Sequence, residues 1–190
     1  SQRQEGGFAA ATFRLEDDEA THTIWPQVFT AELTVMIEDN RLDVELEIFN
    51  RSEAAFEFTA ALHTYLRLGN VELARLEGLE GLSYIDATAG KSRRQDDRYA
   101  LLVDDETDRI YLGANKPLLL SETGRQVAIE QSGFRDVVVW NPWETRIAGL
   151  TDMAPLDFKR MLCVEAAMVE SPVRLVPGED WCGRQTLLAL

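Results

Sequence analysis

The chain has few residues of the kinds that build metal centres, disulfide scaffolds or membrane spans. Its 190 residues include only two cysteines and two histidines. Cys163 and Cys182 form no CxxC motif and have no histidine-rich neighbourhood, so the pattern indicates neither a zinc site nor a disulfide scaffold. No uninterrupted apolar run approaches the roughly 20 residues that a bilayer requires, so we expect no membrane-spanning segment. A reducing cytoplasm is therefore the expected location.

Basic residues are also scarce. The sequence has 19 Lys and Arg against 33 Asp and Glu, which gives a formal net charge of −14. An average surface of this sign repels nucleic-acid backbones and anionic membranes, so neither is expected as a partner. A phosphorylated small molecule is compatible with this charge, because a local pair of arginines can override a distant acidic field.

Helical periodicity is nearly absent. Only residues 153–161 could form a helical turn or two, whereas alternation with a period of two is widespread. It predicts a hairpin from strands at 30–37 and 42–48, joined by "EDNR". Seven further short strands are predicted between 99 and 176, and 86–97 is predicted to be an exposed polar loop. This pattern favours an all-β sandwich of antiparallel strands.

The segment 56–68, "FEFTAALHTYLRL", is apolar on one face and polar on the other. With a period of two, Thr59, His63, Tyr65 and Arg67 lie together, opposite the apolar residues. Such a strand either faces water or lines a cleft. A lone histidine on a strand is more often a hydrogen-bonded structural residue than a catalytic group, so the residues alone leave both interpretations of His63 open.

Two carboxylates lie in or beside apolar strands. Glu165 falls within "RMLCVEAAMV" and Asp136 opens "DVVVWNPW", the motif that also contains Trp140 and Trp143. An unpaired buried carboxylate is unfavourable by several kcal/mol, so Glu165 needs a compensating partner. Backbone N–H groups or an arginine could supply it, and Asp136 could be a turn residue. A histidine and an ionised glutamate form a natural acid and base pair, but sequence cannot show that His63 and Glu165 meet.

Several long motifs occur in a characteristic order. "FTAALHTYLRL", "LEGLEGLSYID", "DVVVWNPW", "DFKRMLCVE" and "PVRLVPGEDWCGRQTL" together resemble the C-terminal two thirds of the glucose-6-phosphate 1-epimerase (hexose-6-phosphate mutarotase) family, which is related to galactose mutarotase. The resemblance implies an antiparallel β-supersandwich with the sugar site on a concave face. It also implies one domain over residues 1–190 that lacks the N-terminal strands of the family.

The resemblance assigns roles by motif. His63 resembles the general acid of the family, Glu165 its general base, and Asp136 the residue that hydrogen-bonds sugar hydroxyls. The implied reaction interconverts the α and β anomers of a hexose 6-phosphate, with glucose 6-phosphate the expected substrate, by acid and base ring opening without a cofactor or metal. Further substrate contacts are expected from Tyr65, Arg67 and Trp140.

Two departures from the family concern the phosphate. Where the family has His-Gly-Phe-Ala-Arg, this chain has "GGFAA", which puts Gly6 at the position of a histidine that contacts the sugar and Ala10 at that of an arginine expected to bind phosphate. Losing an arginine–phosphate contact lowers the affinity for the phosphorylated ligand about a hundredfold, and Arg67 or Arg14 are candidates to replace this arginine. Two alternatives therefore stay open: a catalytically silent carbohydrate-binding or interaction module, and an incomplete domain whose chemistry is not assembled. The oligomeric state does not follow from the sequence.

Overall fold

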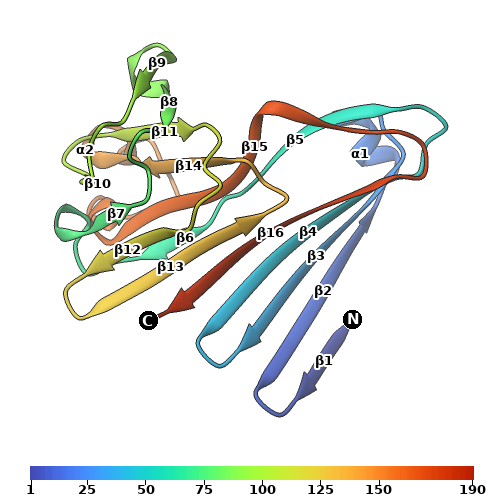
Figure 1. The fold of residues 1–190 in the computed structure, drawn as a ribbon. Helices are drawn as coiled ribbons and strands as arrows, with labels where there is room; N and C mark the ends of the chain where they lie inside the picture. The colour runs from blue at the N-terminus through green and yellow to red at the C-terminus, as the bar shows by residue number, and fades with distance from the viewer.

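Two antiparallel sheets packed against each other form the fold (Figure 1). The computed structural model describes all residues from Ser1 to Leu190. All strand pairings are antiparallel, which confirms the predicted all-β class. The larger sheet has nine strands in the order β1 (Gln2–Glu5), β2 (Phe8–Glu16), β3 (Phe29–Glu38), β4 (Arg41–Asn50), β16 (Asp180–Ala189), β13 (Arg125–Ser132), β12 (Leu118–Glu122), β7 (Arg75–Glu77) and β10 (Ala100–Leu101).

The smaller sheet has seven strands and positions the candidate site. Its longest strand, β15 (Met161–Leu175), is paired on one side with β14 and on the other with both β5 and β6. The order is β5 (Phe56–Leu62), β15 (Met161–Leu175), β14 (Asp136–Asn141), β11 (Thr107–Tyr111), β8 (Ser83–Asp86) and β9 (Ser92–Gln95), with β6 (Tyr65–Arg67) beside β15.

Helical structure is confined to short segments at the ends of strands. At six and five residues, α1 and α2 are the α-helices, and the structure contains no helix with the length and apolarity needed to cross a bilayer. Asp18 caps α1 by accepting a hydrogen bond of 2.8 Å from the backbone N–H of Thr21. The helical segments are α1 (Glu19–Ile24), α2 (Trp143–Ile147), and the 3₁₀ turns η1 (Val71–Leu73), η2 (Ala87–Ala89) and η3 (Asp157–Arg160).

The predicted hairpin is confirmed as β3 and β4. The two strands pair from Glu38 opposite Arg41 onward, and Asp39 in the tight turn between them has a φ of 51°. Two predictions differ from the structure. The strands predicted at 160–169 and 172–176 are one strand, β15, with a register shift, and the helical turns predicted at 153–161 are reduced to η3.

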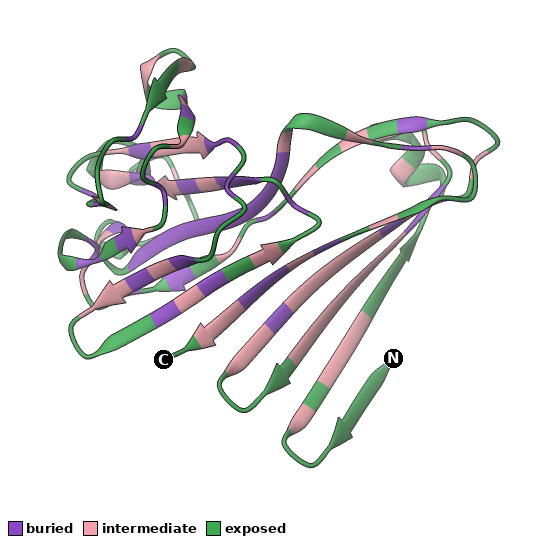
Figure 2. Ribbon diagram, in the orientation of Figure 1, coloured by how far each residue is buried: buried purple, intermediate pink, exposed green.

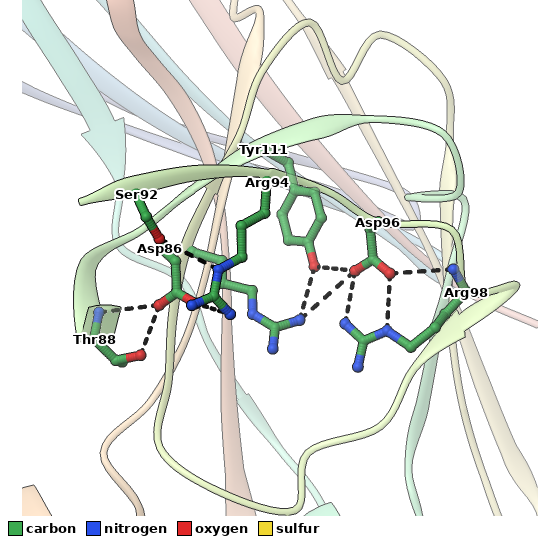
Figure 3. A network of polar contacts seen from close by, with 8 residues as sticks. Asp86, Thr88, Ser92, Arg94, Asp96, Arg98 and Tyr111 are labelled. Atoms are coloured by element: carbon green, nitrogen blue, oxygen red, sulfur yellow. Dashed lines mark hydrogen bonds and ion pairs between the residues drawn. The ribbon is translucent and has the colours of Figure 1, made fainter. Parts of the chain in front are cut away.

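The segment 86–97 is more ordered than the exposed loop that its polarity predicts. It contains η2 and β9, and Asp96, next to its last residue, is buried. Tyr111 donates a hydrogen bond of 2.7 Å to the Asp96 carboxylate, and Arg98 donates two of 2.8 Å to it (Figure 3). These contacts hold the end of the segment against β11, so the polar residues there serve the fold.

The main core lies between the two sheets and includes 19 buried residues. Figure 2 shows β15 as largely buried, whereas β1 and β2 are exposed or half-buried. Val137, Val139 and Val164 point into this core. Because side chains alternate along a strand, Trp140 on β14 and Glu165 on β15 lie on the opposite, outer face of the smaller sheet.

Candidate active site

His63 and Glu165 meet on the outer face of the smaller sheet. His63 lies between β5 and β6, which both pair with β15, the strand that carries Glu165. The chain turns tightly there, with the N–H of Thr64 donating to the carbonyl of Leu62 at 2.8 Å. His63 Nδ1 is 3.4 Å from Glu165 Oε1. The structure therefore brings together the two residues that the sequence could only pair by resemblance.

Aromatic rings surround this pair. The rings of His63 and Tyr65 are stacked at 4.9 Å, and the Trp140 ring meets them edge-on at 5.8 and 6.2 Å. The His63 side chain is 54% exposed, whereas that of Glu165 is 6% exposed. The imidazole is thus accessible from solvent, whereas the carboxylate is almost fully covered.

The environment of Glu165 tunes its proton affinity. Burial raises the pKa of Glu165 to about 7, and the nearby negative charge of Asp108 acts in the same direction. A carboxylate that titrates near neutral pH is suited to exchanging protons with a substrate. The raised pKa therefore makes Glu165 a candidate for proton exchange, and its role as a general base stays a prediction.

Asp108 is a candidate that the sequence analysis missed. It lies on β11 directly opposite Trp140 of β14, on the same outer face as Glu165, and burial raises its pKa. The only sequence signal was the alternation in "TDRIY", which puts Asp108 and Ile110 on one face. The pairing of β11 with β14, which brings Asp108 to the site, cannot be recognised from that pattern.

A group of potential metal ligands lies in the same place. Donor atoms of His63, Cys163 and Glu165 are all within 4.8 Å of one another. Metals that favour this donor set bind the thiolate form of cysteine. Cys163 is fully buried, and burial raises the pKa of its thiol in the metal-free protein, so a metal at this place would have to displace the thiol proton.

Asp136 is on the same face but is engaged by the backbone. It is 3% exposed, and its Oδ2 accepts hydrogen bonds from the N–H groups of Val169 at 2.9 Å and Glu170 at 3.0 Å. Its Oδ1 accepts a longer one of 3.3 Å from Gly113. Asp136 thus holds the irregular part of β15 in place, and its contact with sugar hydroxyls stays a prediction.

We expect Asp136→Ala to lower the free energy of unfolding by at least about 2 kcal/mol, because three backbone N–H groups lose a charged acceptor. Urea unfolding at pH 7 measures the change. Asp104→Ala is the matched control, since Asp104 is exposed and its side chain has no hydrogen-bond partner. Equal stability losses for the two variants would contradict the structural role of Asp136.

Other predicted positions lie elsewhere. Gly6 is in the turn between β1 and β2, and Ala10 and Arg14 are on β2, so all three belong to the larger sheet. Arg14 is paired with Glu16 at 2.7 Å, and its role as a replacement phosphate ligand stays a prediction. Trp143 packs against the core. By contrast, Arg67 is on β6 beside the site, opposite Met161.

Gln185 of β16 fixes the backbone on both sides of the acid and base pair. It is 2% exposed, its Nε2 donates to the carbonyl of Val164 at 2.9 Å, and its Oε1 accepts a hydrogen bond from the Thr64 hydroxyl. Thr64 follows His63, and Val164 precedes Glu165. One amide from the larger sheet therefore supports the backbone beside both residues, in addition to the direct hydrogen bond of 3.2 Å from the N–H of Val164 to the carbonyl of Thr64, and no local motif marked it in the sequence.

The chain is thus an antiparallel β-sandwich that presents a histidine and a buried carboxylate on one face of its smaller sheet. The model of the aldose 1-epimerase family matches residues 1–187. The chain belongs to this family.

Named relatives agree with the resemblance seen in the sequence. A protein of Cenchrus ciliaris, provisionally named a glucose-6-phosphate 1-epimerase, is 34% identical over 172 residues, which are 88% of this chain and 52% of that protein. A similarly named protein of Escherichia coli K12 is 30% identical over 175 residues and is covered to 55%. The chain thus spans about half the length of these relatives.

Solved structures share the fold. A protein from Salmonella typhimurium that is provisionally named a mutarotase superposes with a TM-score of 0.91 at 24% identity. The superposition covers 100% of this chain and 63% of the Salmonella chain. An aldose 1-epimerase homologue from Escherichia coli K12, also provisionally named, gives a TM-score of 0.71 at 12% identity, with 67% of that chain covered. These superpositions confirm the galactose mutarotase-like sandwich.

Proposed function

We propose that this chain is an aldose 1-epimerase-type isomerase that interconverts the α and β anomers of a hexose 6-phosphate. The observation that carries the proposal is the 3.4 Å approach of His63 Nδ1 to the buried carboxylate of Glu165. Family membership supports the anomerase class. The names of the relatives support glucose 6-phosphate as the substrate.

The reaction needs one base and one acid at the anomeric centre. Glu165 accepts the proton of the anomeric hydroxyl while His63 donates a proton to the ring oxygen, so the ring C–O bond breaks and a free aldehyde forms. Rotation about C1–C2 turns the other carbonyl face toward the hydroxyl that attacks. Ring closure returns the protons in reverse, so both residues end in their starting state.

The neighbouring side chains suit a pyranose. Tyr65 and Trp140 offer apolar ring surfaces on which the C–H face of a sugar can lie. Asp108 and Asp136 are carboxylates on the same face, and each can accept hydrogen bonds from hydroxyl groups. In this arrangement the rings orient the sugar, and the carboxylates select its hydroxyl pattern.

A binding module without turnover is the second candidate. It is favoured by Gly6 and Ala10 at the positions where the resembled family has a histidine and an arginine. Such a module would bind the sugar at the same face but would not accelerate anomerisation.

Anomerisation of freshly dissolved α-glucose 6-phosphate, followed by polarimetry or NMR, tests the proposal. We expect acceleration above the buffer rate, with kcat/KM falling as the pH decreases below about 7, because only ionised Glu165 can act as the base and its pKa is raised to about 7. Sugar binding without acceleration in folded protein would favour the module. A flat profile between pH 5 and 8 would contradict the role of Glu165.

A further inference from the structure

Three arginines converge at the end of β6. Arg67 on β6, Arg125 at the start of β13 and Arg160 just before β15 line a cleft of about 370 Å³ together with Leu68 and Gly69. They come from distant parts of the sequence and from both sheets. In a chain with 33 acidic and 19 basic residues, this concentration of positive charge is opposite in sign to the average surface.

The backbone holds these arginines in place. The N–H of Leu68 donates to the carbonyl of Arg160 at 2.8 Å, and Arg125 Nη1 donates to the carbonyl of Arg67 at 2.8 Å. The second bond joins β13 of the larger sheet to β6 of the smaller sheet, and the first holds the ends of β6 and β15 together. They use only the carbonyl groups of Arg67 and Arg160, so both of those guanidinium groups stay available to a ligand.

The charges in the cleft do not balance. Arg125 is the one arginine of the three that forms an ion pair, with Glu122 at 3.2 Å, and Glu122 also accepts a hydrogen bond from the N–H of Gly69. Three guanidinium groups therefore face one carboxylate. A phosphate monoester carries a charge of about −1.5 to −2 at neutral pH and accepts paired hydrogen bonds from arginine, so it matches the surplus.

The cleft is next to the acid and base pair. Side chains alternate along β6, so His63, Tyr65 and Arg67 point to the same side, and across β15 Tyr65 faces Cys163 while Arg67 faces Met161. Four residues of extended chain span at most about 13 Å between the Cα atoms of His63 and Arg67. A hexose 6-phosphate and the side chains at its two ends can bridge such a gap, and the exposed Tyr65 ring lies in between.

We propose that Arg67, Arg125 and Arg160 bind the phosphate of a phosphorylated hexose whose anomeric end lies at His63 and Glu165. The inference rests on the proposed function, because it places the substrate of that reaction. It gives the chain a phosphate site that does not need an arginine at position 10, where Ala10 stands.

Calorimetric titration of glucose 6-phosphate, glucose and inorganic phosphate tests the site. The variant is Arg67→Met/Arg160→Met, which removes two guanidinium groups and keeps the carbonyl groups that hold Leu68 and Arg125. We expect it to weaken glucose 6-phosphate binding by roughly 100-fold or more and to abolish the preference over glucose, since two charge-assisted contacts are lost. Arg14→Met, which removes an arginine paired with Glu16 on β2, is the control and should bind like the wild type.

The outcomes separate this site from the proposed reaction. Wild-type affinity in the double variant, or an equal loss in Arg14→Met, overturns the phosphate site even if the enzyme anomerises sugars. No binding of glucose 6-phosphate or phosphate by the folded wild type also overturns it. Arginine-dependent binding without turnover supports the site and counts against the enzyme.

Discussion

His63→Ala and Glu165→Gln each lower kcat/KM for glucose 6-phosphate anomerisation by roughly 10²- to 10⁴-fold, the range expected when one general acid or base is removed. In the proposed reaction the two residues, which are 3.4 Å apart, each transfer one proton to or from the sugar, so neither can complete the reaction alone. The double variant should be little worse than either single variant, because groups that act as a unit are not additive. Polarimetry at pH 7.5 with α-glucose 6-phosphate measures all three.

The chain offers a matched histidine control. His22, the other histidine, is in α1 and pairs with Asp17 at 2.8 Å, so His22→Ala should anomerise at the wild-type rate. Full activity in His63→Ala, with a fold confirmed by circular dichroism, would remove the acid role. A similar loss in His22→Ala would show that the assay reports stability rather than catalysis.

Glu165→Gln should also make the protein more stable at alkaline pH. The folded state holds the pKa of Glu165 at about 7, above the 4.5 of an unburied glutamate, so the unfolded chain ionises first as pH rises. The loss of stability caused by ionising the buried Glu165 is therefore absent below about pH 4.5 and complete above about pH 7. The stability difference between variant and wild type should therefore grow by on the order of 3 kcal/mol from pH 4.5 to pH 8.

Urea unfolding of the wild type and the variant at pH 4.5 and pH 8 gives this difference. The titration of all other groups largely cancels when the two proteins are compared at the same pH. Glu130→Gln is the control for the loss of a glutamate charge, since Glu130 is exposed on β13. A Glu165→Gln variant whose stability gain is the same at pH 4.5 and pH 8 would contradict the raised pKa.

The sequence predicted the features that depend on local alternation. Period-two patterns identified β3, β4 and the two faces of 56–68, because a half-buried strand must separate apolar from polar side chains. The resemblance then selected His63 and Glu165. Their spatial approach came from the structure, since it depends on how β5 and β6 pair with β15.

Features that depend on pairing between distant strands were not predictable. Asp108 joins the site only through the register of β11 with β14, and Gln185 only through the packing of one sheet on the other. The hydrogen bonds from the backbone of β15 to Asp136 were likewise not foreseen, and its contact with sugar hydroxyls stays a prediction. Long-range pairing leaves no periodic signal in a single sequence.

The two hydrogen bonds of Gln185 connect the final strand to both parts of the candidate site. They add to the direct link between the two parts, in which the N–H of Val164 donates to the carbonyl of Thr64 at 3.2 Å. The backbone beside His63 and the backbone beside Glu165 are thus each held from two directions, along the smaller sheet and from the larger sheet behind it. A substitution at Gln185 would remove the second support from both residues at once.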